Sequence, residues 1–322
     1  MIERTWVEPP DVDVPPDLRA QVGGHPLVAE TLVRRGIRDV ARARTFLDPD
    51  QYSSASPFEL PGLETAVERL ERAIATGESI CVWGDFDVDG QTATTLLVST
   101  LDDLGARVRY HIPDRQKRSH GVHLPKLKSL IAEGVDLVLT CDTGITAHQA
   151  VAYAQERGVD VVVTDHHDLP ETLPPARAVV DPKMLPQDHP LRELPGVGVA
   201  YELAQALYER AGRPEAVRQH LDLVALGIVA DVATQTGDVR YLLQRGLEAL
   251  RRTERLGLRA LMEQAGIRRE SVDEEDIGFG LAPRLNALGR LDDANVAVEL
   301  LTTEDLARAR VLASMLEGLN AR

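Results

Sequence analysis

The sequence SICVWGDFDVDGQTATTLL, residues 79–97, decides the fold class of this chain. Its first five residues form the short apolar run that is typical of a buried strand, and a helical pattern occupies about residues 91–104. A polar turn with three aspartates, Asp85, Asp87 and Asp89, connects the two patterns. This order predicts a strand–turn–helix unit of an α/β fold, with the aspartates at the carboxyl end of the strand.

The alternation of strands and helices continues to about residue 180. Further strand patterns occupy residues 106–112, 136–141, 160–164 and 176–180, and helical patterns lie between them at 125–133 and 146–157. Pro125 suits a first helical turn and Gly134 a C-terminal cap, while Thr146 with Gln149 has the form of a capping box. Such alternation predicts an α/β fold with a parallel sheet and helices on both of its faces.

Helical patterns precede and follow this α/β region. Residues 1–75 begin with the proline-rich stretch VEPPDVDVPPD, which disfavours a regular helix, and contain helical patterns at 27–46 and 63–75. Beyond about residue 190 we expect helices at 198–211, 215–230, 239–251, 256–265, 277–301 and from 304 onward. The part of the chain after the sheet is therefore predicted to be mostly helical.

The composition is that of an ordinary globular protein. The 322 residues are 43% hydrophobic and 27% charged, and a net charge of −15 argues against a uniformly basic surface that coats nucleic acid. The N-terminus lacks the pattern of a secretory signal, and no apolar run approaches the ~18 residues of a membrane span, so we expect a cytoplasmic protein. Cys81 and Cys141 lie in apolar runs and are expected to be packed thiols rather than a disulfide.

Acidic and imidazole side chains follow two more of the predicted strands. DTGI, residues 142–145, follows one strand, and DHHD, residues 165–168, follows the next. Each motif alone also suits a structural role as a polar turn, a helix cap or a hydrogen-bonded core histidine. Because the carboxyl ends of parallel strands meet at one edge of a sheet, the three motifs together favour a functional site there.

A cluster of carboxylates needs a compensating charge. Two carboxylates about 4 Å apart repel by roughly 4 kcal/mol at an effective dielectric constant of about 20. Oxygen ligands with one or two imidazoles suit Mg²⁺ or Mn²⁺ better than zinc. Two such ions about 3.5 to 4 Å apart can activate a water molecule and stabilise an in-line displacement at phosphorus. The cluster therefore predicts a metal-dependent phosphoesterase.

These motifs resemble those of the DHH phosphoesterase superfamily, named for the triplet found here at residues 165–167. Within it, the chain is similar to the RecJ-type single-strand exonucleases from about residue 79 to 322. Four further stretches carry this similarity: LPGVGVAYEL (194–203), DLVALGIVADV (222–232), IGFGLAPRLNALGRLDD (277–293) and ARVLASMLEGLNAR (309–322).

The resemblance implies two divalent cations, Mn²⁺ or Mg²⁺, and a set of residues that hold them. The metal ligands that it implies are Asp85, Asp87, Asp89, Asp142, His166 and Asp231. Asp142 would bridge the two ions, and Asp85 would support the site directly or through another ligand. The resemblance gives a catalytic role to His167, which would face the scissile phosphate, and to Asp165. Many superfamily members carry a histidine ligand where this chain has Trp83.

A basic segment and a later polar motif are the expected substrate contacts. Residues 105–128 contain seven basic residues against one acid, a local reversal of the net charge, although a solvated surface has the same pattern. The resemblance expects the wall of a DNA path there. The expected substrate-binding residues are Arg115, His120, Arg284, Asn286 and Arg290, with Arg284 assigned to the terminal phosphate.

The function implied by the resemblance is processive 5′-to-3′ hydrolysis of single-stranded DNA to 5′-mononucleotides, in DNA repair and recombination. Its implied partners are single-stranded DNA and a single-strand-binding protein or helicase. One alternative is a DHH phosphodiesterase that acts on short oligonucleotides or cyclic dinucleotides. The other is a non-catalytic, RecJ-like replication scaffold, which the retained aspartates and histidines disfavour.

The sequence patterns and the resemblance together predict three parts along the chain. These are a helical preface at 1–75, a DHH catalytic domain at 76–303 and, at 304–322, the start of a long connecting helix. That helix is expected to lead to a second catalytic subdomain beyond residue 322.

Overall fold

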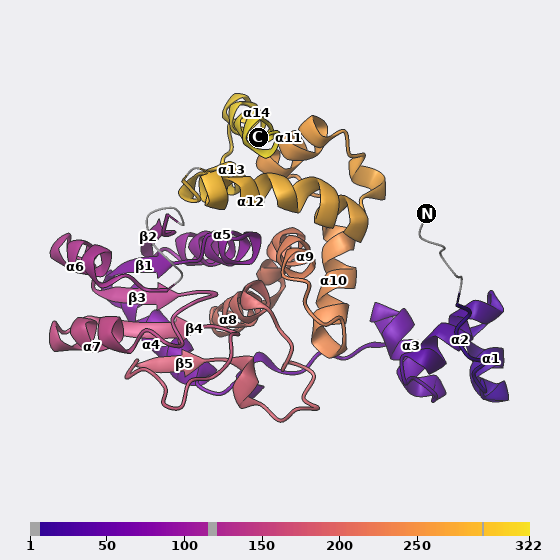
Figure 1. The fold of residues 1–322 in the computed structure, drawn as a ribbon. Coiled ribbons are helices and arrows are strands. Elements are labelled where there is room, and N and C mark those ends of the chain that lie inside the picture. Colours follow the sequence, from indigo (N-terminus) through magenta and orange to yellow (C-terminus); the bar gives the residue numbers. More distant parts are fainter. Residues whose placement is uncertain (1–6, 115–120, 292) are drawn as a thin grey trace. The chain divides into compact units, whose positions relative to one another are not determined.

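A five-stranded parallel sheet forms the centre of the computed structural model, which describes residues 7–114, 121–291 and 293–322 (Figure 1). In spatial order the strands are β2 (Arg107–His111), β1 (Ser79–Trp83), β3 (Leu137–Thr140), β4 (Asp160–Thr164) and β5 (Ala178–Val180). All neighbouring pairs are parallel. The predicted parallel sheet is confirmed, and every predicted strand is present.

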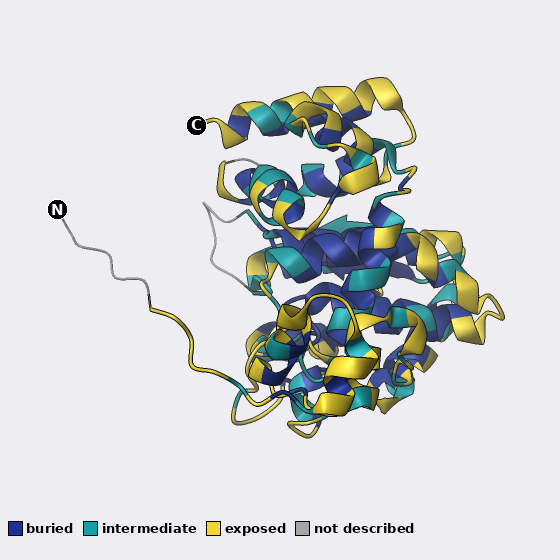
Figure 2. Cartoon of the chain, turned by 90° about the vertical axis from the view of Figure 1, so that its right-hand side faces the viewer, coloured by how far each residue is buried: buried dark blue, intermediate teal, exposed yellow. Residues whose placement is uncertain are grey.

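Helices cover both faces of the sheet. One face carries α4 (Leu63–Thr76), α5 (Val88–Asp103) and α8 (Gly196–Arg210), and the other carries α6 (Leu124–Ala132) and α7 (His148–Glu156). Alternate residues of β1 divide between the two layers, because successive side chains of a strand point to opposite faces. Ile80 and Val82 join the first core, whereas Cys81 and Trp83 join the second. Figure 2 shows buried residues concentrated through these layers, with exposed residues on the outward faces of the helices.

The remainder of the chain is helical, as predicted. Its main elements are α9 (Leu221–Ala230), α10 (Gly237–Leu250), α11 (Leu256–Ala265), the π-helix η6 (Asp276–Leu281), α12 (Ala282–Leu291), α13 (Asn295–Thr302) and α14 (Leu306–Asn320). α5 packs against α8, α9 and α13, so the first helix after the aspartate turn is buried almost along its whole length.

Three local expectations for the part of the chain after residue 54 are wrong. The helix expected at 215–230 is a 3₁₀ segment, η4 (Pro214–His220), followed by α9. The helix expected at 277–301 is divided into η6, α12 and α13, and Asp293 accepts a hydrogen bond from the Asn295 N–H at the start of α13. The capping box at Thr146 is absent, because α7 begins only at His148 and no side chain caps it.

The chain divides into two compact units, residues 1–53 and residues 54–322. The first contains α1 (Pro16–Val22), α2 (Pro26–Arg34), α3 (Val40–Leu47) and the 3₁₀ helix η1 (Pro49–Gln51). It has its own small core, which includes Leu18, Leu32 and Ala43. The helix expected at 27–46 is interrupted at Gly36, whose φ of 79° suits glycine. The compact division falls before α4, whereas the predicted preface, which ends at residue 75, includes all but the last residue of α4. The predicted domain limits remain a prediction.

Two further expectations concern cysteines and membrane spans. Cys81 and Cys141 are both buried and free, as predicted. Among the described residues, no helix has the length and apolar composition that a membrane crossing requires.

Candidate metal centre

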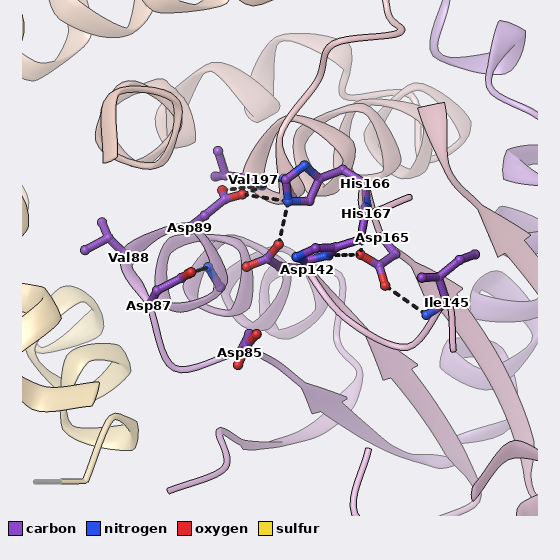
Figure 3. A network of polar contacts seen from close by, with 12 residues as sticks. Asp85, Asp87, Val88, Asp89, Asp142, Ile145, Asp165, His166, His167 and Val197 are labelled. Atoms are coloured by element: carbon purple, nitrogen blue, oxygen red, sulfur yellow. Dashed lines mark hydrogen bonds and ion pairs between the residues drawn. The ribbon is translucent and has the colours of Figure 1, made fainter. Parts of the chain in front are cut away.

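The acidic cluster lies at the carboxyl ends of β1, β3 and β4, which are neighbours in the sheet (Figure 3). Asp85 follows β1, Asp142 follows β3, and Asp165 follows β4. All three carboxylates are buried. The parallel pairing therefore brings together residues that are far apart in the sequence, as the strand-end motifs predict.

Asp87 and Asp89 reach the cluster from the first turn of α5. Asp87 is the N-cap of that helix and accepts a hydrogen bond from Gly90 N–H at 3.0 Å. The Asp89 carboxylate accepts the N–H groups of Gly196 at 2.6 Å and Val197 at 2.7 Å. These N–H groups begin α8, where the first turn of a helix has no carbonyl partners of its own. The start of α8 thus fixes Asp89, and the Asp89 side chain is only 1% exposed.

Asp142 and His166 face one another at the centre of the cluster. The Asp142 Oδ1 atom lies 2.9 Å from His166 Nε2, yet this buried oxygen accepts no hydrogen bond. The same His166 nitrogen lies 3.7 Å from Asp89 Oδ2. Asp142 has a φ of 59°, in the left-handed region that aspartate tolerates better than most residues. Two metal-ligating groups this close, with no hydrogen bond at the Asp142 oxygen, are placed so that one divalent cation could bind both.

Asp165 has a different role from the carboxylates around it, because donors surround it. It accepts hydrogen bonds from Ile145 N–H at 2.8 Å, from His166 N–H at 2.8 Å and from His167 Nδ1 at 2.6 Å. Burial alone would raise the pKa of Asp165, but the hydrogen bond and charge of His167, together with these N–H groups, hold that pKa below its usual value. The hydrogen bond to Asp165 raises the pKa of His167 to about 9. His167 is therefore a cation at neutral pH, held in place by an ionised carboxylate.

Asp231 comes to the cluster from the end of α9. The Val232 N–H donates to the Val229 carbonyl at 3.2 Å, and the Ala233 N–H donates to the Ile228 carbonyl at 3.2 Å. These two bonds form a Schellman motif, which ends the helix at Asp231. Asp231, Asp89 and His166 each offer a ligand atom within 4.8 Å of the others, and so do Asp142, His166 and His167.

Burial and the repulsion between neighbouring carboxylates shift the pKa values of the groups in the cluster. Burial, followed by the charges of Asp231 and Asp87, raises the pKa of Asp89 well above its usual value. Burial, followed by the charge of Asp89, does the same for the pKa of Asp142. Burial also lowers the pKa of His166 to about 4, so this imidazole is neutral and able to bind a metal.

The residues present fit divalent cations. The cluster combines carboxylate oxygens with a neutral imidazole and leaves the buried Asp142 Oδ1 without a hydrogen bond. Glycine makes the close approach possible, because a Cβ atom at Gly196 would lie 2.7 Å from Asp142 Oδ1. At Gly227 it would lie 2.9 Å from Asp89 Oδ1.

One carboxylate at the same sheet edge was missed by sequence reasoning. Asp181 directly follows β5, is fully buried, and has an Oδ2 atom without a hydrogen-bond partner. Burial raises the pKa of Asp181 to about 7. The signal was available, because Asp181 follows the strand pattern at 176–180 as the other acids follow theirs.

The predicted substrate residues fall into three groups. Asn286 and Arg290 line a cavity of about 320 Å³ together with Asp87, Asp89 and Asp231. Arg284 is only 14% exposed and donates to Glu317 at 2.5 Å and to the Gly280 carbonyl at 2.7 Å, and it is not among the residues that line this cavity. Arg115 and His120 lie outside the described residues.

Two other predicted features are explained by packing. Trp83 is fully buried and packs edge-on against His111 at 4.7 Å between ring centroids, within the core that α6 and α7 cover. In the basic segment, Arg109 lies 3.5 Å from Glu133, and the Lys128 ammonium lies 4.9 Å from the centre of the Tyr153 ring. Part of the positive charge of that segment is therefore used within the fold.

Comparison with known proteins supports this arrangement. The family model described as "DHH family, N-terminal domain" matches residues 79–228. The single-stranded-DNA-specific exonuclease RecJ of Bacillus subtilis is 41% identical over 317 residues, which are 98% of this chain and 40% of that protein. RecJ of Thermus thermophilus is 42% identical over 264 residues, which are 82% of this chain and 38% of that protein.

Two solved structures are also similar. A crystal structure of exonuclease RecJ bound to manganese has a TM-score of 0.76 and 41% identity, and the match covers 82% of this chain and 66% of that one. Thermus thermophilus RecJ in complex with Mn²⁺ has a TM-score of 0.83 and 36% identity, and the match covers 97% of this chain and 45% of that one. The chain spans about two fifths of the length of these two curated relatives.

Proposed function

Because this chain belongs to the DHH family and matches the RecJ exonucleases over most of its own length, we propose that it is the catalytic part of a metal-dependent exonuclease. Its substrate is single-stranded DNA, which it hydrolyses from the 5′ end to 5′-mononucleotides. The observation that carries this proposal is the meeting of Asp89, Asp142 and His166 at the sheet edge, with a buried Asp142 oxygen that accepts no hydrogen bond.

The metal ligands in this proposal are Asp87, Asp89, Asp142, His166 and Asp231, with Asp85 in support. Two Mn²⁺ or Mg²⁺ ions held by these residues would supply activation of a water molecule and neutralisation of charge on the phosphate oxygens. The carboxylates of these aspartates serve as metal ligands rather than as nucleophiles.

The groups around the metal ligands bind and orient the DNA. His167, with its pKa raised to about 9 by the hydrogen bond to Asp165, presents a positive charge to the scissile phosphate. Asp165 keeps the imidazole in one orientation through the 2.6 Å bond to Nδ1. Asn286 and Arg290, which share a cavity with Asp87 and Asp89, contact the strand beside that phosphate. The substrate roles assigned to Arg115, His120 and Arg284 remain part of the proposal.

The direct test follows end-labelled single-stranded DNA with and without Mn²⁺. Mononucleotides released first from the 5′ end support the proposal, and the double variant Asp87→Ala, Asp142→Ala should lose this activity. The matched control is Asp168→Asn, an exposed acid next to His167, which should keep it. Release from the 3′ end, internal cuts or full activity in the double variant would contradict the proposal. Rapid cleavage of dinucleotides with intact long DNA would favour the short-oligonucleotide alternative.

The cellular setting follows from this substrate. We infer a role in DNA repair and recombination in the cytoplasm, with a single-strand-binding protein or a helicase supplying the exposed strand. Co-purification with each candidate protein, in the presence and absence of single-stranded DNA, tests this part separately from the chemistry. The non-catalytic scaffold alternative predicts such partners without Mn²⁺-dependent hydrolysis.

A further inference from the structure

An apolar groove lies directly beside the acidic cluster. It encloses about 660 Å³ between the end of α9, the π-helix η6, α12 and the end of α14. It shares Ala230, Asn286 and Arg290 with the smaller cavity that Asp87, Asp89 and Asp231 line. The two cavities therefore adjoin one another at these residues, and a chain bound at the acidic cluster can extend toward the groove.

Two large apolar side chains of this groove are exposed to an unusual degree. Phe279 is 83% exposed and Val232 is 86% exposed, more than any other large apolar side chain of residues 54–322 that the structure describes. Single exposed apolar residues are common, but two that line one groove next to a polar site indicate a binding surface.

Val232 is held in a backbone conformation that its side chain disfavours. It occupies the position after the α9 cap with a φ of 57°, where a Schellman motif usually has glycine. A β-branched residue with this φ is a genuine outlier, and such strain is concentrated at functional sites. Glycine would form the same motif without strain, so the exposed isopropyl group is the part of Val232 that needs an explanation.

Phe279 is presented by an irregular helix. It lies in η6, a π-helical turn, and such turns occur frequently at functional sites. The neighbouring Gly280 allows η6 to pack closely on α11 and the turn after it, because a Cβ atom there would lie 2.6 Å from Ile267 Cδ1. Phe279 itself remains outside this contact. Arg290 and Arg322 line the same groove against a single acid, Glu274, so the charge of the groove favours a negatively charged ligand such as a nucleic-acid strand.

We propose that Phe279 and Val232 form a stacking platform for one nucleobase of the single-stranded DNA whose phosphate lies at the acidic cluster. This inference rests on the proposed function and adds the residues that recognise an unpaired base. An aromatic ring stacks on any base, because every base has a π-face, so the platform is tolerant of sequence. Bases within a duplex are stacked on one another, and the platform therefore discriminates in favour of single strands.

The test combines variants of the full chain with DNA that lacks one base. A 3′-fluorescein oligothymidylate and a series with one abasic site at successive positions are titrated in Ca²⁺ by fluorescence anisotropy. In the wild-type protein, one position of the series should bind about tenfold more weakly, as the loss of one base stack predicts. Phe279→Ala should bind the intact strand about tenfold more weakly and show no position dependence, whereas Phe279→Trp should retain both properties. Leu306→Ala is the matched control, because Leu306 is an exposed apolar residue at the start of α14 outside the groove.

The outcomes separate this inference from the proposed function. Mn²⁺-dependent hydrolysis of the intact strand is measured on the same protein preparations. If wild-type protein neither binds nor hydrolyses the strand, both proposals fail. If it does so but every abasic position binds equally, or Phe279→Ala binds like the wild type, the stacking platform alone is overturned. A Phe279→Ala variant that changes only self-association would assign the patch to a protein contact and also overturn the platform.

Discussion

The buried carboxylate of Asp142 has opposite effects on the stability of the fold and on metal binding. Its carboxylate is buried beside Asp89, and its Oδ1 accepts no hydrogen bond although His166 Nε2 lies 2.9 Å away. A buried charge without a partner is costly, so this residue lowers the stability of the metal-free fold. The same property makes it a strong ligand, and the two effects can be separated by experiment.

Asp142→Asn should stabilise the metal-free protein and abolish its response to Mn²⁺. We expect the free energy of unfolding at pH 7 to rise by at least about 1 kcal/mol, the equivalent of one unit of pKa shift. The folded-state pKa of Asp142 is raised above its unfolded value. The free energy of unfolding of the wild type should therefore fall as the pH rises from about 4 through the raised pKa, because the carboxylate ionises more readily in the unfolded chain. Urea unfolding in EDTA over this pH range checks both points. An Asn variant that is less stable without metal would contradict this account.

Val232 is a second residue whose conformation in the folded protein lowers stability. Val232→Gly should raise the free energy of unfolding by roughly 0.5 to 1 kcal/mol, because relief of the left-handed backbone exceeds the entropy that glycine gains in the unfolded state. Little packing is lost, since the side chain is 86% exposed. Val232→Ala is the control, because alanine keeps a Cβ at the same φ and should gain less. Chemical unfolding of the three proteins compares them, and a destabilised glycine variant would show that the valine is not strained.

At the scale of elements, the start of α8 organises the metal centre. Its first two N–H groups bind Asp89, and the absence of a side chain at Gly196 makes room for Asp142. One helix terminus therefore holds a residue of α5 and lies against a residue that follows β3. A small shift of α8 would move both ligands.

Gly196→Ala should reduce Mn²⁺ affinity at least about tenfold while the protein remains folded, since the added Cβ would lie 2.5 Å from Asp142 Cβ and must displace it. Isothermal titration with Mn²⁺ and circular dichroism measure the two properties. Gly318→Ala in α14 is the matched control, because a Cβ there meets no atom within 4 Å. Unchanged Mn²⁺ affinity in the Gly196 variant would mean that Asp142 does not need its present position.

The strand ends and several helix ends were predictable, such as those of α11 (Leu256–Ala265), whereas the division of longer helical patterns was not. Apolar runs and the acids behind them lie next to one another in the sequence, so the positions of Asp85, Asp142 and Asp165 follow from the parallel sheet. The division of the segment 277–301 depends on tertiary contacts and on the turn at Asp293, which periodicity does not reveal. For Asp231, only family resemblance predicted a place at the site, because nothing local relates the end of α9 to a distant sheet edge.

At the scale of the whole molecule, the described residues of the candidate centre all belong to the unit of residues 54–322. That unit includes α4, whose Leu63, Val67 and Leu70 enter the main core. Arg69 of α4 also binds Asp160 and Glu78, both at 2.6 Å. α4 is therefore part of the α/β layer rather than of the small helical unit.

A chain of residues 54–322 should fold and bind Mn²⁺ like the full chain. We expect its melting temperature to change by no more than about 4 °C, the equivalent of about 1 kcal/mol. A chain of residues 76–322, which begins at the predicted domain limit, should fail to fold, because it exposes the apolar face that α4 covers. Thermal unfolding of both chains decides between the two limits, and a stable 76–322 chain would favour the limit predicted from the sequence.

The spread of the ligands along the chain has a consequence for the order of folding events. From Asp85 to Asp231 they come from separate strands and helices, and the last one is positioned only when the α9 terminus has formed. An unfolded or half-folded chain cannot bring these groups to one ion, so the complete centre exists only on the native side of the folding barrier. Manganese should therefore slow the escape from the native state and leave the speed of folding nearly unchanged. The bound ions would thus increase the kinetic stability of the folded protein without accelerating its folding.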